Sequence, residues 1–179
     1  MDGKAFLIFG TAISILAAVP AHAAQLEFDC DVPADRFSSV SQDVANGGSV
    51  SGTIRVDKMR EGNNSPVAGA GIFGPEKRAI AAFHLIASDA RAKNFDIIFF
   101  VTHGGDLKEG KVGEVGASTA IEFNISLSAV GKAILTVNGA QFQADATAIS
   151  GGRAMAFCST AQFEFTNLIF SASGEGGGG

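Results

Sequence analysis

Strict alternation of apolar and polar residues limits the fold of this chain more than any other feature. In the segment 121–127 every odd-numbered residue is apolar and every even-numbered residue is polar. A period of two belongs to a β-strand with one buried face and one wet face. The same alternation occurs at 25–32 and 50–56, whereas 78–88 and 95–101 are mostly apolar on both faces. We therefore expect amphipathic strands and, between them, central strands buried on both sides.

Turn signals divide the chain into short segments. Asn138–Gly139 lies between two apolar runs and accepts positive φ at both residues, which predicts a type I′ hairpin. The last strand, expected at 161–171, loses its alternation near Asn167, which predicts a β-bulge. Residues 42–46 are compatible with a short helical turn. Turn-rich stretches lie at 46–48, 61–66, 69–75, 103–110 and 150–153. The sequence thus predicts an all-β protein of roughly nine to eleven strands, arranged as an antiparallel β-sandwich.

Two segments carry a resemblance to a known fold family. The hairpin 133–142 and the final strand 163–170 resemble those of the concanavalin-like and laminin-G-like jelly-roll sandwiches. The resemblance implies a jelly roll in which the first and last strands are neighbours. It also implies that glycan binding or glycan chemistry is worth testing, although a shared fold does not establish an activity. An immunoglobulin-like sandwich is the alternative, but the chain lacks the tryptophan of that fold.

The two ends of the chain differ from the middle. Residues 5–19 are apolar and uncharged, Pro20 follows, and Ala21–Ala23 has the A-x-A form of a signal-peptidase site. We expect a signal peptide at 1–23, cleaved on export to the periplasm or the outside. A single β-sandwich domain is expected at 24–172, followed by a flexible glycine-rich tail at 173–179. No later segment is long and apolar enough for a membrane helix.

The two cysteines, Cys30 and Cys158, are expected to pair. In an exported domain of this size one disulfide is the usual outcome, and it would close nearly the whole domain. Two buried free thiols are the alternative. The spacing offers no zinc site, because no histidine lies beside either cysteine.

Charge and composition exclude several classes of protein. The net charge is −5, which argues against a nucleic-acid surface. Hydrophobic residues make up 46% of the chain and charged residues 17%, which argues against disorder. The chain has no Trp and no Tyr. Carbohydrate sites rely on aromatic platforms, and most of the phenylalanines fall on expected buried faces. Composition therefore counts against a carbohydrate enzyme and against a lectin.

Few residues form a constellation that could carry chemistry. His103, Asp106 and Glu109 lie around two glycines, where they could bind a ligand, although a polar turn explains them as well. A polar sheet face could bind through four further residues. These are Arg55, Asp57, Glu122 and Asn124. His84 is expected to be a hydrogen-bonded core histidine, with a groove residue as the alternative.

Calcium is the only metal that the sequence suggests, and we expect no other cofactor. Its candidate ligands are Asp29, Asp31 and Asp35, although Cβ atoms two residues apart on a strand are about 7 Å apart, wide for one ion. No catalytic motif was found, so an enzyme is the less favoured class. We favour an exported, non-enzymatic module with a binding or structural role and a glycan or protein partner. Alternatives are a glycan-binding or glycan-active protein and a self-assembling surface or matrix protein.

Overall fold

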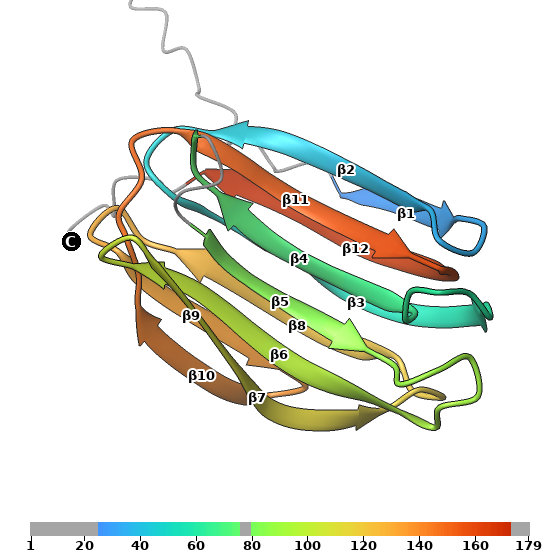
Figure 1. Cartoon of the computed structure of the whole chain (residues 1–179). Helices are drawn as coiled ribbons and strands as arrows, with labels where there is room; N and C mark the ends of the chain where they lie inside the picture. Colours follow the sequence, from blue (N-terminus) through green and yellow to red (C-terminus); the bar gives the residue numbers. More distant parts are fainter. Residues whose placement is uncertain (1–24, 76–79, 173–179) are drawn as a thin grey trace, which may run out of the picture.

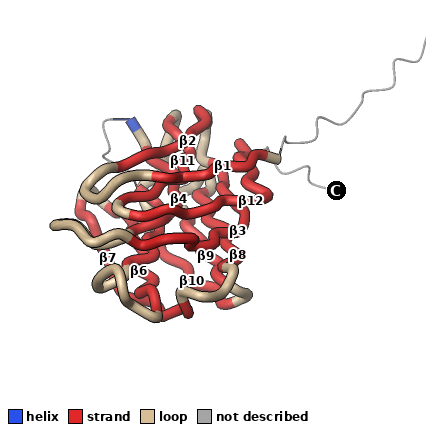
Figure 2. Tube along the Cα trace, turned by 90° about the vertical axis from the view of Figure 1, so that its right-hand side faces the viewer, coloured by secondary structure: helices blue, strands red, loops and turns tan. Residues whose placement is uncertain are grey.

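The computed structural model describes residues 25–75 and 80–172. The expected signal peptide, the glycine-rich tail and the start of the segment 78–88 lie outside these residues. Most of the described part is strand, and the rest is almost entirely loops and turns (Figure 2). None of it forms a helix long and apolar enough to cross a lipid bilayer.

Twelve antiparallel strands form two six-stranded sheets that pack face to face (Figure 1). The predicted antiparallel β-sandwich is therefore confirmed. In the back sheet the order is β1 (Leu26–Asp31), β12 (Ala161–Ala172), β3 (Gly48–Met59), β8 (Ile121–Leu127), β9 (Lys132–Val137), β10 (Ala140–Asp145). In the front sheet the order is β2 (Phe37–Val44), β11 (Gly152–Ser159), β4 (Val67–Phe73), β5 (Ile80–Ile86), β6 (Asn94–His103), β7 (Asp106–Gly116).

The core lies between the sheets and follows the alternation of the strands. The apolar residues of β8 are all buried, while Glu122 and Asn124 are exposed, as the period of two predicts. Rings from opposite sheets meet in the core, because Phe83 of β5 lies 5.2 Å from Phe123 of β8, between ring centroids. Burying one such ring stabilises the fold by about 1.5–3 kcal/mol.

The last strand confirms the predicted β-bulge. Its pairing with β3 shifts between Thr166 and Ile169, and Asn167 has a φ of 52°. Before the bulge Phe163 and Phe165 are buried, and after it Leu168 and Phe170 are buried. The extra residue therefore changes which side chains of the strand face the core. β12 also pairs with β1, so the first and last strands are neighbours, as the jelly-roll resemblance implied.

The Asn138–Gly139 hairpin is also confirmed. β9 and β10 pair directly on either side of it, and the two turn residues have φ values of 46° and 83°. The Asn138 side chain has a second role, because its Oδ1 accepts a hydrogen bond of 2.8 Å from the Glu122 backbone N–H. The turn residue thus ties the hairpin to the neighbouring strand β8.

Four strands of the front sheet were not predicted. β4 and the start of β11 lie in stretches interpreted as turns, and so does the first half of β7. Residues 42–44, expected in a helical turn, belong to β2 instead. Glycine and serine lower the strand signal of these segments, whereas pairing in the sheet satisfies their backbone groups whatever the side chain.

The Cys30–Cys158 disulfide is confirmed and joins the two sheets. Cys30 lies on β1 of the back sheet, and Cys158 lies on β11 of the front sheet. Their Cα atoms are 6.1 Å apart, and both residues are buried in the core. The bond closes a loop across a sequence separation of 128 residues.

Removing this disulfide is expected to destabilise the domain strongly. On the chain-entropy model a loop of this length contributes about 4–5 kcal/mol through the unfolded state. The Cys30→Ala/Cys158→Ala double variant should therefore unfold at a clearly lower urea concentration than the oxidised protein. Circular dichroism is the suitable probe, because the chain has no Trp. An unchanged midpoint would contradict the expectation.

Candidate functional site

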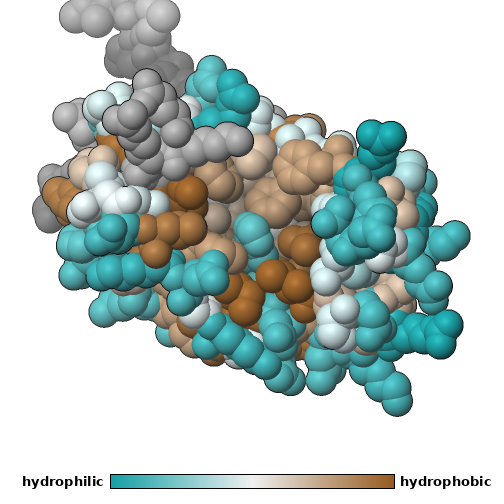
Figure 3. Space-filling view, in the orientation of Figure 1, coloured by the Kyte–Doolittle hydropathy of each residue, from teal (hydrophilic) through white to brown (hydrophobic). Residues whose placement is uncertain are grey.

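The outer side of the front sheet is apolar, although it faces away from the core. We call this outward side of β2, β11, β4, β5, β6 and β7 the front face. Figure 3 shows an apolar, hollowed surface here, bordered by hydrophilic side chains. The segments expected to be buried on both sides, β5 and β6, are buried on the inner side, and most of their outward side chains on this face are only partly exposed. Its partly exposed apolar residues include Val67, Phe73, Ile80, Ile86, Ile98, Phe100 and Met155.

An aromatic row crosses the front face from one side to the other. Phe37 of β2 stacks on Phe157 of β11 at 5.7 Å, measured between ring centroids. The Phe157 ring meets the His84 imidazole of β5 at 5.1 Å, and His84 lies 4.3 Å from Phe100 of β6. Aromatic contacts at such distances contribute about 0.5–1.5 kcal/mol each beyond burial. Phe37, at one end of the row, is 59% exposed, whereas Phe157 is buried and His84 and Phe100 are partly exposed.

Glycines in β4 make the row continuous. Gly69 pairs with Phe157 on one side and with His84 on the other, so no side chain separates the two rings. A Cβ at Gly69 would lie 2.8 Å from Phe157 Cζ and would overlap the Phe83 carbonyl oxygen. A Cβ at Gly71 would lie 2.5 Å from the Ala82 Cβ. These small residues keep the centre of the front face low. Gly69, Gly71 and Ala82 are themselves buried, so the neighbouring side chains cover them.

His84 differs from the expected hydrogen-bonded core histidine. Its ring lies between two phenyl rings on the front face, and no described residue donates a hydrogen bond to it or accepts one from it. The groove alternative is therefore the one that the structure supports. Burial lowers the pKa of His84 from 6.5 to about 4. The imidazole is consequently neutral at physiological pH, with one nitrogen as donor and the other as acceptor.

Charged residues border the front face and neutralise one another. On β7, Lys111 Nζ lies 2.8 Å from Asp96 Oδ1 and 2.5 Å from Glu114 Oε1. Both hydrogen bonds raise the pKa of Lys111, and the bond to Asp96 has the larger effect. At the opposite border Arg153 Nε lies 3.5 Å from Asp43 Oδ1. Arg153 and Asp43 stand at the rim of a pocket of about 610 Å³. Phe73, Ile80 and Met155 are the large apolar side chains that line this pocket.

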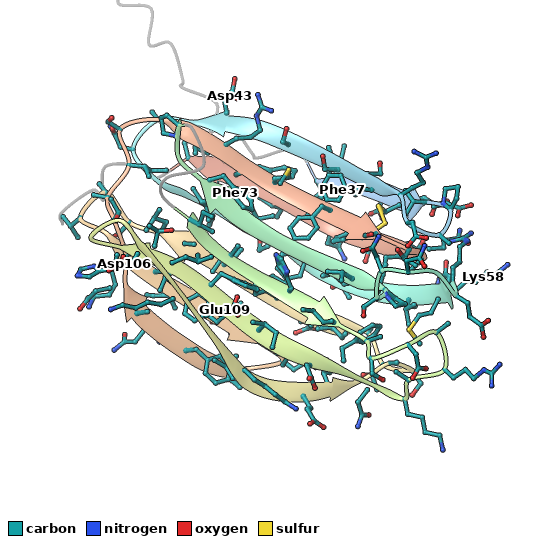
Figure 4. The ribbon with its side chains drawn as sticks, viewed as in Figure 1. Phe37, Asp43, Lys58, Phe73, Asp106 and Glu109 are labelled. Carbon is teal, nitrogen blue, oxygen red and sulfur yellow. A yellow bond between two sulfur atoms is a disulfide. The ribbon has the colours of Figure 1, made fainter. Side chains whose placement is uncertain are left out.

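The predicted cluster His103, Asp106 and Glu109 lies at one border of this face. His103 and Asp106 pair across the Gly104–Gly105 turn, whose residues have φ values of 63° and 94°. The turn is therefore a two-residue hairpin, and all three side chains are exposed. Glu109 is directly opposite Phe100 in the sheet. It therefore lies at the β7 end of the line of cross-strand neighbours that runs through Gly71 (Figure 4). No hydrogen bond joins these three described side chains to one another.

The other predicted binding residues lie on the opposite side of the sandwich. Arg55 and Asp57 are on β3, Glu122 and Asn124 are on β8, and all four point outward from the back sheet. Arg55 holds Asp57 at 3.1 Å and Glu164 at 2.6 Å. The hydrogen bond with Glu164, and then the charge of Asp57, raise the pKa of Arg55. These residues form a polar ladder on the outside of the back sheet, and Asp57 also lines an open pocket of about 370 Å³ at the end of β3.

The three calcium candidates each have their own partner. Asp29 accepts a hydrogen bond from Gln162, and Asp31 forms an ion pair with Arg60 at 2.5 Å. Asp35 accepts four hydrogen bonds from the backbone and side-chain amides of Asn63 and Asn64, and these bonds lower its pKa. Its carboxylate thus holds the loop before β4. Among the described residues no group of three potential metal-ligating side chains comes together.

A second pocket, of about 480 Å³, lies among the loops at one end of the sandwich. Polar loop residues line most of it, and the ion pair between Arg91 and Glu61 crosses it at 3.2 Å. Both side chains are largely exposed. The front face is the stronger candidate site, because exposed apolar surface costs free energy and is retained where it binds something.

Sequence reasoning missed most of this site. Phe100 lies in a segment expected to be buried on both faces, no strand was expected at Phe37 or Phe157, and Gly69 and Gly71 were assigned to a turn-rich stretch. The signal that could have indicated the site is the double-sided apolar pattern of β5 with a histidine on one side. Such a pattern is typical of a strand that the rest of the protein covers on both faces, or of a strand whose second face binds a ligand.

Solved structures with the same arrangement of strands confirm the fold. The chain is similar to a Scytalido-glutamic peptidase with a peptide-based transition state analog, at a TM-score of 0.61 and 13% identity over 79% of this chain and 82% of that one. It is similar to carbohydrate binding module CBM66 from Bacillus subtilis, at a TM-score of 0.51 and 12% identity over 83% of this chain and 92% of that one. It is also similar to a Bacillus licheniformis β-glucanase, at a TM-score of 0.51 and 9% identity over 87% of this chain and 95% of that one.

This chain therefore has a concanavalin-like jelly-roll fold. No family model and no curated protein matches it in sequence. At identities near one tenth the likeness establishes the fold alone, because one sandwich serves proteins that cut peptides and proteins that bind or cut glycans. The activity must be argued from the chain's own residues.

Adding a methyl group at Gly71 is expected to destabilise the front sheet. Gly71→Ala would place Cβ against Ala82 and the backbone of β5, at a cost of about 1–3 kcal/mol. Gly110→Ala on the edge strand is the matched control, because its Cβ would meet nothing within 4 Å. Urea unfolding followed by circular dichroism measures both. Equal stability of the two variants would contradict the close approach of β4 and β5.

His84 is expected to make stability depend on pH in a defined window. Its folded-state pKa of about 4 lies below the ordinary 6.5, so the unfolded chain binds the proton more readily. Its stabilising effect is complete above about pH 6.5 and is lost as the pH falls toward 4. Between pH 7.5 and 4.5 the loss should be about 2.5 kcal/mol. The free energy of unfolding of His84→Phe should vary much less over this range; an identical profile would exclude His84 as the cause.

Proposed function

We propose that the mature chain is an exported, non-catalytic module that binds a glycan across the front face. The observation that carries the proposal is the aromatic row Phe37–Phe157–His84–Phe100 on an otherwise apolar sheet face. A sugar ring has an apolar C–H face that packs on an aromatic ring, while its hydroxyls reach polar groups at the side. Phenylalanine offers the same stacking surface as Trp and Tyr, without their hydrogen-bonding group.

The similar structures support a glycan ligand. Two of the three reported above are, by name, a carbohydrate binding module and a β-glucanase. The third is a peptidase, so a peptide is the other polymer to test. The chain's own surface favours the glycan, because the front face offers stacking rings and exposes no unpaired strand edge at its centre. Peptide recognition by strand addition needs such an edge.

The distribution of carboxylates supports a non-catalytic role. Glycoside hydrolysis needs two carboxyl groups about 5–10 Å apart on either side of the bond that is cut. Among the described residues, the outward positions of β11, β4 and β5 carry no carboxylate. Asp43, Glu109 and Glu114 lie on the edge strands β2 and β7, and Asp96 is paired with Lys111. A ligand on the middle of the front face would therefore meet apolar side chains rather than an acid–base pair.

Export is supported by the disulfide together with the signal sequence expected at 1–23. A disulfide buried between two sheets forms and persists in an oxidising compartment, such as the periplasm or the outside of the cell. A role on extracellular or cell-wall glycans fits that location.

Removing the exposed ring should weaken binding without unfolding the protein. Phe37→Ala deletes a ring that is 59% exposed, so it should change stability little and weaken glycan binding at least tenfold. Val130→Ala is the matched control, because Val130 is 88% exposed and lies between β8 and β9 of the back sheet. Isothermal titration with soluble β-glucan and alginate measures both. Binding that Phe37→Ala leaves intact would overturn the front face as the site.

Self-assembly is the outcome that would replace this proposal. The same apolar face could bury itself against a second copy of the chain. Sedimentation at several protein concentrations separates the two roles: a monomer at all concentrations supports a glycan-binding face. A dimer that Phe37→Ala dissociates, in a protein that binds no glycan, would assign the face to self-association.

A further inference from the structure

One pocket of the front face lies apart from the aromatic row. It is formed by β2, β11, β4 and β5 toward one end of these strands, and its volume is about 610 Å³. One line of direct neighbours across the four strands is Asp43, Arg153, Phe73 and Ile80, and Met155 follows on β11. Ligand pockets in proteins commonly enclose about 300–1,000 Å³ and combine apolar walls with a few polar groups. This pocket has that size and that composition.

The rim of the pocket offers both hydrogen-bond donors and acceptors. Arg153 Nε lies 3.5 Å from Asp43 Oδ1, and the two side chains are 62% and 88% exposed. Neither of them forms a hydrogen bond with another side chain that the structure describes. The guanidinium can therefore donate to a ligand, and the carboxylate can accept from it. Hydroxyl groups match this rim, because each of them both donates and accepts.

The charges at the rim favour a neutral ligand over an acidic one. Asp43 and Arg153 cancel each other, so the pair adds no net charge to the pocket. A sugar carboxylate would compete with Asp43 for Arg153 and would stand beside a like charge, whereas hydroxyl groups can bond to both members of the pair. The whole chain carries a net charge of −5, which also repels an acidic polymer.

The pocket and the exposed Phe37 ring lie toward opposite ends of the front face. Asp43 and Phe37 are six residues apart on β2, which pairs with β11 in one continuous register, so both side chains point outward. At about 3.3 Å per residue they are roughly 20 Å apart. In Figure 4 Asp43 and Phe73 lie to the left of Phe37. A chain held at one of the two places binds more readily at the other, which raises the affinity for a long ligand.

We propose that this pocket holds one unit of an uncharged glycan, whose apolar face packs on Phe73 and whose hydroxyl groups bond to Asp43 and Arg153. The inference rests on the proposed glycan-binding function and names its substrate class and the residues that select it. Asp43 and Arg153 give direction to the contact, since the apolar side chains contribute area alone. Phe37 holds a further unit of the same glycan chain.

The first experiment replaces the exposed carboxylate. Soluble mixed-linkage β-glucan and alginate are titrated calorimetrically into the full mature protein at pH 7.5, and wild type should bind β-glucan at least tenfold more tightly. Asp43→Ala should weaken β-glucan binding about tenfold, because it removes a hydrogen bond to a charged group. The same variant should strengthen alginate binding, because it removes a like charge. Asp43→Asn, whose amide oxygen still accepts, should retain part of the β-glucan affinity.

The second experiment separates the pocket from the Phe37 ring by the length of the ligand. Cellobiose is too short to reach both places, so Asp43→Ala should weaken its binding and Phe37→Ala should leave it unchanged. Both variants should weaken the binding of β-glucan. Glu122→Ala is the matched control, because it removes an exposed carboxylate from the back sheet. It should leave both affinities unchanged, and the circular dichroism spectra of all variants should match that of wild type.

Each outcome separates the inference from the function on which it rests. If Asp43→Ala binds β-glucan as tightly as wild type does, the pocket is not part of the site, while the glycan-binding function stands. The same holds if cellobiose binding is lost in Phe37→Ala and retained in Asp43→Ala. If alginate binds more tightly than β-glucan, the uncharged class is wrong and the function again stands. If wild type binds neither polymer, both proposals fall.

Discussion

The close approach of β4 and β5 is the constraint on which the candidate site depends. The two strands are so near that a single methyl group at Gly71 would overlap the neighbouring strand, and one at Gly69 would meet both backbone and the Phe157 ring. Without side chains there, rings from β11 and β5 meet across β4 and form one aromatic row. The glycines thus weaken β4 as a strand, but they allow the rings of its two neighbours to touch across it.

The two sides of the sandwich have opposite characters, although both are sheet faces in contact with solvent. The back face carries polar side chains joined by ion pairs, such as Arg55 with Glu164. The front face carries partly exposed aromatic and aliphatic side chains with charges only at its borders. If solubility were the only requirement, both faces would carry polar side chains like those of the back face. The difference is therefore the strongest sign that the front face meets another molecule.

The sequence allowed good predictions where a strand has one buried and one exposed face. β8 alternates without a fault, the Asn138–Gly139 turn sets the β9–β10 register, and the loss of phase at Asn167 locates the bulge of β12. The pairing of Cys30 with Cys158 followed from export and chain size. The predictions failed for β4 and β7, because a glycine-rich segment has little pattern of its own and becomes a strand only when neighbours pair with it.

The sequence by itself determined the all-β class, the sandwich, the hairpin, the bulge and the disulfide. Each of these follows from local periodicity, from turn chemistry or from the presence of just two cysteines in the chain. Only the tertiary structure decided which apolar residues are core and which are surface. Phe83 and His84 are adjacent in sequence, yet one is fully buried between the sheets and the other stands on the front face. Alternation shows that two such residues point in opposite directions. Which direction leads to the core depends on where the second sheet packs, and that depends on contacts between residues far apart in the chain.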